Sequence, residues 1–171
     1  MANTYVLISS NTLSSSAASV TFSSIPSTYT DLVVRISARG NRASTLDDSY
    51  IQFNSDTASN YSDTLVRAYG SSAGSSRNSS NNLMRIRSFP AADNTANVFG
   101  SAEIYIPSYL ANQNKPVGAV NQYSDTVTDS WEGATAGLWR NTAAITSMSI
   151  YPESGSFVSG SSFYLYGIRS S

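Results

Sequence analysis

Residues 31–39 read DLVVRISAR, and every second side chain from Leu32 onward is apolar, whereas the side chains between them are mostly polar or charged. Leu32, Val34, Ile36 and Ala38 would share one face of an extended chain, because successive side chains of a β-strand point to opposite sides of a sheet. Residues 98–106 repeat the pattern, with four apolar side chains on one face. The period of two residues, rather than the 3.6 of a helix, predicts β-strands packed on a core through one face.

Shorter or less regular strand patterns recur along the rest of the chain. They occupy residues 5–9, 19–22, 50–53, 64–69, 83–89, 116–123, 134–140, 145–151 and 162–168. Clusters of Ser, Asn, Asp, Gly and Pro, which are typical of turns, separate them. Many short strands with short polar links predict an all-β protein, an antiparallel β-sandwich. Eight or more strands favour a jelly roll over a seven-stranded immunoglobulin-like domain.

The last of these segments differs from the others because it is apolar on both faces. Phe163 and Leu165 would lie on one side, and Tyr164, Tyr166 and Ile168 on the other. A strand in the middle of a sheet has this pattern when both of its faces are covered. We therefore expect residues 162–168 to be a central strand.

The length of 171 residues fits a single β-sandwich domain over residues 1–171. Residues 70–82 read GSSAGSSRNSSNN and contain no aliphatic side chain larger than alanine. Such a low-complexity composition predicts a flexible hairpin loop at about residues 70–82. A long loop on a rigid sandwich can also contact a partner.

The composition excludes most enzyme mechanisms. The chain has no histidine and no cysteine, whereas serine occupies 35 positions. Triads built on His or Cys and most zinc sites therefore cannot form. Glu103, Glu132 and Glu153 could in principle serve a glycosidase, but their strand and turn contexts favour solubility and surface pairing. We expect no catalytic residue and no enzymatic activity.

Cofactors are also not expected. The pairs Asp47–Asp48 and Asp125/Asp129 could offer oxygen ligands, but neither has the spacing of a calcium-binding loop, and aspartate is common in turns. No Gly-rich segment is followed by the Gly-Lys-Ser/Thr of a phosphate-binding loop. The sequence therefore predicts no metal site and no cofactor site.

The charge balance argues against nucleic acid and membrane partners. Ten basic and eleven acidic residues give a net charge of −1, so the chain has no overall positive charge that would attract nucleic acid or an anionic membrane. No segment has the roughly 18 consecutive apolar residues of a membrane helix. Nine of the ten basic residues are arginine, which is better tolerated than lysine in protein interfaces. This bias favours contact with protein.

The first candidate contact set consists of arginines. They alternate with apolar residues and should project from sheet faces, so they form a candidate partner interface. The set is Arg35, Arg39, Arg67, Arg85 and Arg87. Simple solvation, or ion pairing with aspartates, is the alternative.

The second candidate set is aromatic. Trp131, Trp139 and Tyr109 could stack on sugar rings, as aromatic side chains of β-sandwich lectins do. Aromatic side chains in a sandwich belong more often to the core or to subunit contacts, so that interpretation comes first.

The C-terminal third carries the most distinctive sequence: GLWRNTAAITS at 137–147, GSF at 155–157 and GSSFYLYGI at 160–168. It resembles structural proteins of tailed bacteriophages, in which a tryptophan-containing strand, an "AAIT-S" strand and a "GS-F-LYGI" strand end the polypeptide. Residues 22–32 (FSSIPSTYTDL) and 50–61 look like the same family. The resemblance therefore covers nearly the full length.

The resemblance implies a non-enzymatic virion structural protein, located in the virion after assembly in the host cytoplasm. We expect a capsid decoration or cement protein on the particle exterior, with the phage major capsid protein or another virion protein as its partner. Avidity and the threefold positions of an icosahedral lattice favour a homotrimer. The alternative is a carbohydrate-binding module of a tail fibre or receptor-binding protein, whose partner would be a glycan.

Overall fold

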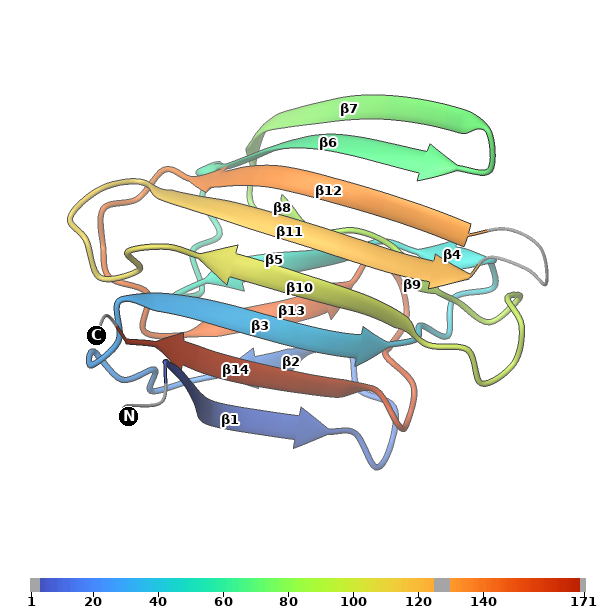
Figure 1. Cartoon of the computed structure of the whole chain (residues 1–171), viewed down its shortest axis with the longest axis horizontal. Coiled ribbons are helices and arrows are strands. Elements are labelled where there is room, and N and C mark those ends of the chain that lie inside the picture. Colours follow the sequence, from blue (N-terminus) through green and yellow to red (C-terminus); the bar gives the residue numbers. More distant parts are fainter. Residues whose placement is uncertain (1–3, 125–129, 170–171) are drawn as a thin grey trace.

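Two antiparallel sheets of unequal width face each other in the computed structural model, which describes residues 4–124 and 130–169 (Figure 1). The wide sheet has the order β1 (Tyr5–Thr12), β14 (Ser162–Ile168), β3 (Asp31–Ala38), β10 (Gly100–Ile106), β11 (Lys115–Ser124), β12 (Ser130–Trp139), β6 (Tyr61–Tyr69) and β7 (Ser72–Asn81). The narrow sheet has the order β2 (Val20–Phe22), β13 (Met148–Pro152), β5 (Ser49–Phe53) and β8 (Met84–Arg85). A short pair, β4 (Leu46–Asp47) and β9 (Phe89–Pro90), makes a third, two-stranded sheet.

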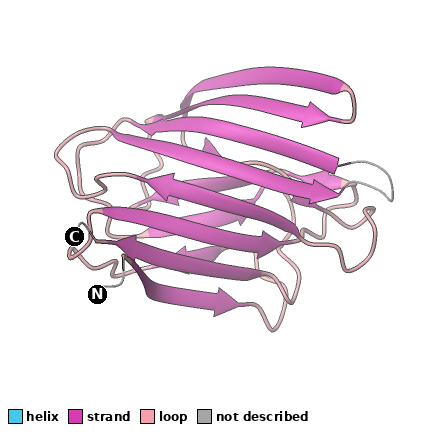
Figure 2. Ribbon diagram, in the orientation of Figure 1, coloured by secondary structure: helices cyan, strands magenta, loops and turns pink. Residues whose placement is uncertain are grey.

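The prediction of an all-β antiparallel sandwich is confirmed (Figure 2). Each of the predicted strand segments contains strand residues, although 83–89 is divided between β8 and β9. Across residues 4–124 and 130–169, no helix has the length and apolar character needed to cross a bilayer.

Two hairpins, β6–β7 and β11–β12, make up one side of the wide sheet. If they and the β4–β9 pair are set aside, eight strands remain: β1, β2, β3, β5, β8, β10, β13 and β14. Numbered from one to eight along the chain, these strands are ordered 1-8-3-6 in the wide sheet and 2-7-4-5 in the narrow sheet. The two hairpins therefore widen only one of two four-stranded sheets.

The core lies between the sheets and follows the predicted alternation. Leu32, Val34 and Ile36 of β3 point inward and are buried. Val33 points to the outer face of the wide sheet and is buried as well, because Tyr105 and Tyr166 flank it on the neighbouring strands. Val33 is thus covered, whereas Arg35 and Ser37 on the same side of β3 are exposed.

The closing strand β14 is central, as its two-sided apolar pattern predicts. It pairs with β1 on one side and β3 on the other. Phe163 and Leu165 are fully buried in the core. A Cβ atom at Gly167 would collide with the ring of Tyr29, so glycine is required for this close packing.

The prediction of a loop at 70–82 is wrong. Only Gly70 and Ser71 form a turn, and residues 72–81 form the edge strand β7. Gly70 has a φ of 51°, which glycine adopts readily in a tight turn. The backbone of β7 pairs with that of β6 over most of its length, and this pairing does not require large side chains. A composition-based argument misses such a strand.

The single lysine of the chain is buried. The Nζ atom of Lys115 donates hydrogen bonds to the carbonyl oxygens of Ala111, Gln113 and Thr142. Burial lowers the pKa of the Lys115 ammonium group. Lys115 therefore fixes the loops at one end of the wide sheet instead of contributing charge to the surface.

Candidate functional site

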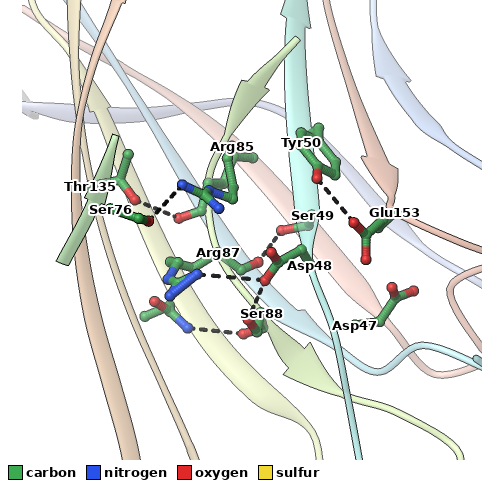
Figure 3. Close-up of polar contacts among 12 residues, drawn as sticks. Asp47, Asp48, Ser49, Tyr50, Ser76, Arg85, Arg87, Ser88, Thr135 and Glu153 are labelled. Carbon is green, nitrogen blue, oxygen red and sulfur yellow. Dashed lines mark hydrogen bonds and ion pairs between the residues drawn. The ribbon is translucent and has the colours of Figure 1, made fainter. Parts of the chain in front are cut away.

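Three residues after β8 run between the two sheets (Figure 3). Ile86, Arg87 and Ser88 are almost completely buried. Ser49 of β5 bonds their backbone from one side, through its N–H to the Arg87 carbonyl and its carbonyl to the Ile86 N–H. From the wide sheet, the Thr135 hydroxyl donates to the Ile86 carbonyl at 3.1 Å. Both sheets therefore fix this segment in place.

Asn121, on β11, also anchors the segment of residues 86–88. Its Nδ2 atom donates to the Ser88 carbonyl at 2.9 Å, while its Oδ1 atom has no hydrogen-bond donor among the described residues. Asn121 is buried. One unsatisfied acceptor therefore lies next to the buried segment.

Arg87 is a strained and buried cation. Its φ of 146° lies in a region that favours glycine, and such strain is concentrated at functional sites. The side chain is 2% exposed, and its guanidinium carbon lies 4.5 Å from the Trp131 ring centroid. Nη1 lies 3.6 Å from Asp48 Oδ1, whereas Nε and Nη2 have no hydrogen-bond partner in the described structure. Burial lowers the pKa of Arg87 to about 10, although Asp48 opposes this shift.

Arg85 is better compensated than Arg87. Its Nη2 atom lies 3.1 Å from Oδ1 of the buried Asp63 and donates to the Ser76 hydroxyl at 3.0 Å. Its Nε atom has no partner within the described part of the chain. The pair links β8 to both strands of the β6–β7 hairpin.

Arg67 lies on the same inner side of the wide sheet. It stands in register with Gly133 on β12 and with Gly74 on β7. A Cβ atom at Gly133 would lie 3.2 Å from Arg87 Nε, and one at Gly74 would lie 3.2 Å from Arg67 Nε. The two glycines therefore provide the space that the guanidinium groups occupy.

A recess of about 260 Å³ opens beside Arg67 at the end of the β6–β7 hairpin. Arg67 itself is exposed, because the narrow sheet ends at β8. The lining residues are Arg67, Tyr69, Ser72, Ala73, Gly74 and Trp131. The recess thus combines a cation, aromatic edges and a strand of small residues.

The candidate arginines fall into separate places. Arg35 is exposed on the outer face of the wide sheet and pairs with Glu103 at 2.9 Å. Arg39 is buried, and its guanidinium group donates to four carbonyl oxygens of residues 92–98, which lie just before β10. The prediction that all five arginines project from sheet faces is wrong for Arg39 and Arg87. Arg39 follows the last residue of β3 and Arg87 follows β8, so strand alternation no longer governs their direction.

The candidate aromatic residues are mainly core residues. Trp139 is fully buried against Phe53, and Tyr109 is fully buried with its hydroxyl donating to the Pro26 carbonyl. Neither ring can stack on a sugar, so the glycan-stacking assignment is wrong for both. Trp131 is 5% exposed, and the ring of Tyr123 stacks on it with the centroids 5.4 Å apart. Of the three, only Trp131 lines the recess.

Four residues that hold the arginines of this region in place were not predicted in that role. They are the carboxylates Asp48 and Asp63 and the glycines Gly74 and Gly133. Glycine inside a strand often marks the close approach of another group, so Gly133 carried a usable signal. The carboxylates carried no signal of this role: Asp48 was considered only as a possible oxygen ligand of a metal, and nothing in the local sequence distinguishes Asp63 from a surface residue.

The outer face of the wide sheet is the second notable surface. Its exposed large apolar side chains include Tyr5, Leu7, Val66, Tyr105 and Val120. Two shallow depressions of about 270 and 320 Å³ share Val120 and Ala134. The face therefore exposes apolar side chains over a broad area that is only shallowly hollowed, beside charged residues such as Arg35 and Glu103.

Gly118 lies within this face, in register with Tyr105 and Ala136. A Cβ atom at Gly118 would meet no atom within 4 Å. Packing within the chain therefore gives no reason for glycine at this position.

The predicted carboxylates do not form one group. Glu103 and Glu132 lie on the outer face of the wide sheet, on strands separated by β11, and Glu153 follows β13 in the other sheet. Glu153 contacts Arg42. It also accepts a hydrogen bond from the Tyr50 hydroxyl at 3.3 Å (Figure 3). In the ranges that the structure describes, no three acidic side chains gather as a metal site requires. Asp125 and Asp129 lie outside the described residues.

Asp47, which lies next to Asp48, is a buried carboxyl group with a strongly shifted pKa. It is 2% exposed, and its Oδ2 atom has no hydrogen-bond partner in the described structure. Burial raises the pKa of Asp47 to about 6, although a backbone hydrogen bond from Ser154 and the nearby Arg42 oppose the shift. The folded protein therefore binds this proton more tightly than an unfolded chain, in which the pKa is about 3.9.

We predict that the free energy of unfolding of Asp47→Asn, compared with that of the unmodified protein, is more favourable at pH 7 than at pH 4. As the pH rises from about 4 through about 6, the folded protein must ionise a carboxyl group that the unfolded chain ionises more easily, so this group destabilises the fold. The full effect is about 2–3 kcal/mol. Urea unfolding of both proteins at pH 4 and pH 7 should show the difference between them moving in favour of the variant by about 2 kcal/mol.

Asp93→Asn is the matched control, because Asp93 is exposed. This variant should track the unmodified protein at both pH values. If Asp47→Asn also tracks it, burial does not hold the proton on Asp47.

Neither the protein-family models, nor the curated proteins, nor the solved structures with which we compared the chain include a match to it. What the chain does must therefore be inferred from its own residues and their arrangement.

Proposed function

We propose that the chain is a non-catalytic structural protein of a tailed-phage virion, a decoration or cement protein on the capsid exterior. The outer face of the wide sheet is the observation that carries this proposal, because it exposes large apolar side chains and its two shallow depressions are lined mainly by small and apolar residues. The resemblance of residues 137–147, 155–157 and 160–168 to phage structural proteins supports a place on the virion. The partner would be the phage major capsid protein.

We also propose that the fold is a jelly roll widened by two hairpin insertions. The orders 1-8-3-6 and 2-7-4-5 of the eight remaining strands support it, since the last strand lies beside the first in one sheet and the seventh beside the second in the other. Jelly rolls are common in viral capsid proteins and lectins. The two hairpins would then be additions that enlarge the contact face.

Gly118 supports contact with another protein at this face. Glycine inside a strand costs about 0.5–1 kcal/mol relative to alanine, and no neighbour of Gly118 requires it. Glycine in a strand also allows another backbone to approach closely. The capsid shell would approach the sheet at Gly118, with apolar contact provided by Tyr105 beside it on β10 and by Val120 two residues further along β11.

Three copies in a homotrimer would hold such a shell longer than one. Linked weak contacts gain in effective affinity without any single contact becoming strong. Sedimentation of the purified protein should give a trimer and not a monomer.

Gly118→Arg is expected to weaken binding to empty capsids at least tenfold while leaving the fold intact. The new side chain would have open space in the isolated protein, but it would place a charge where the shell has to approach. Co-sedimentation with empty capsids measures the binding, and thermal melting checks the fold.

Thr21→Arg is the matched control, since Thr21 is exposed on β2 of the opposite sheet. It should bind capsids like the unmodified protein. Equal binding by both variants would exclude the outer face. A protein that ignores capsids but binds isolated tails would favour the tail-fibre alternative.

A further inference from the structure

We propose that the recess at the end of the β6–β7 hairpin binds one carboxylate-bearing sugar residue, a uronic acid. The recess lies on the inner side of the wide sheet, whereas the proposed capsid contact is on the outer side. The site would exist whether or not the protein binds a capsid. It is therefore independent of the proposed function.

The charge around the recess favours an anion. Of the three arginines in this region, Arg67 lines the recess, whereas Arg85 and Arg87 have carboxylate partners, Asp63 and Asp48, among the described residues. Among residues 4–124 and 130–169, no carboxylate lies within ion-pair distance of Arg67. A planar guanidinium group binds a carboxylate through two parallel hydrogen bonds. Arg67 is thus an exposed cation with no carboxylate partner among the described residues, and it would anchor one carboxylate.

The buried arginine behind the anchor strengthens this field. Arg87 packs over Trp131, which itself lines the recess. The Nε and Nη2 atoms of Arg87 have no acceptor in the described part of the chain, and its only ion pair is long at 3.6 Å. A positive charge held in low dielectric acts on an anion more strongly than one in water. The strained backbone at Arg87 fixes this charge in place.

The shape and lining of the recess select a sugar ring. A volume of about 260 Å³ suits one ring-sized group and is small for a peptide segment. Tyr69, which is 38% exposed, supplies an apolar surface for the C–H face of a ring, and Ser72 supplies a hydroxyl group. Only a small part of Trp131, which is 5% exposed, reaches the recess. A uronic acid combines such a face with hydroxyl groups and a carboxylate, so it matches all three parts of the lining.

An NMR titration of the 15N-labelled protein with sodium glucuronate tests this assignment. Saturable shifts are expected at Arg67, at residues 72–74 and at the Trp131 indole N–H. Glucose, which lacks the carboxylate, should bind at least tenfold more weakly. Acetate, which lacks the ring, should also bind at least tenfold more weakly.

Arg67→Gln should weaken glucuronate binding at least tenfold. The matched control is Arg77→Gln, an exposed arginine on the same hairpin whose side chain points to the opposite face. This control should bind glucuronate unchanged.

The proposal fails if glucuronate causes no saturable shift at the recess, or if Arg67→Gln binds it normally. Equal binding of acetate or glucose would also overturn it. Tighter binding of an oligoglutamate peptide than of glucuronate would assign the recess to an acidic protein partner instead. None of these results bears on capsid binding through Gly118.

Discussion

A chain that ends at Ser162 is expected not to fold. Removing residues 163–171 deletes all but the first residue of β14, which pairs with both β1 and β3, so the wide sheet loses a strand from its interior. Phe163 and Leu165 are fully buried, and each contributes about 1.5–3 kcal/mol by its burial. The total stability of a domain is only about 5–15 kcal/mol. Circular dichroism should show no cooperative melting transition.

A chain that ends at Ile168 is the matched control, because it retains all of β14. It should melt cooperatively near the temperature of the full-length protein. If the shorter chain also melted there, β14 would be peripheral to the fold and its place between β1 and β3 would need revision.

Trp139→Ala is expected to cost about 3–5 kcal/mol of unfolding free energy. The indole ring is fully buried, with its centroid 5.4 Å from that of Phe53 and 6.3 Å from that of Tyr61. The substitution leaves a large cavity and removes a hydrogen bond in which Nε1 donates to Asp56 Oδ2 at 2.8 Å. Urea unfolding measures the loss.

Leu110→Ala serves as the control, since Leu110 is 36% exposed. This substitution should lower the free energy of unfolding by no more than about 0.5 kcal/mol, as other surface substitutions do. Similar losses for the two variants would contradict the central place of Trp139 in the core.

The lost hydrogen bond also has a pH signature. Burial alone would raise the pKa of Asp56, but hydrogen bonds from Asn60, Trp139, the Ala58 backbone and Asn141 lower it to about 2. The stability from this low pKa is present above about pH 4 and is lost as the pH falls toward 2. Trp139→Ala should therefore lose less stability than the unmodified protein as the pH falls from about 4 to about 2.

The strands were predictable where alternating side chains recorded which face is buried. The segment 31–39 and the closing segment 162–168 show this, because large apolar residues occupy their inward positions. The strand β7 was not predictable, since its stability comes from backbone pairing with β6 and its Ser-rich side chains record no burial. Periodicity reports on side-chain burial and is silent about edge strands held by the main chain.

The recess was harder to predict than the fold. Arg67 and Trp131 were named as candidates, but in separate sets, and only the pairing of β12 with β6 brings them together. Arg87 was expected to project outward, whereas the irregular backbone after β8 turns it inward. A strand rule cannot be applied to a residue whose φ departs from a strand.

The buried position of Lys115 decides how this protein can be labelled. Its ammonium group is the only lysine amine of the chain and is enclosed by three carbonyl oxygens, so amine-directed dyes and surface-coupling reagents find no lysine on the folded surface. The absence of cysteine offers the complementary route. A single thiol introduced at an exposed position such as Ser75 would be the unique reactive side chain for a fluorophore, a spin label or a tether.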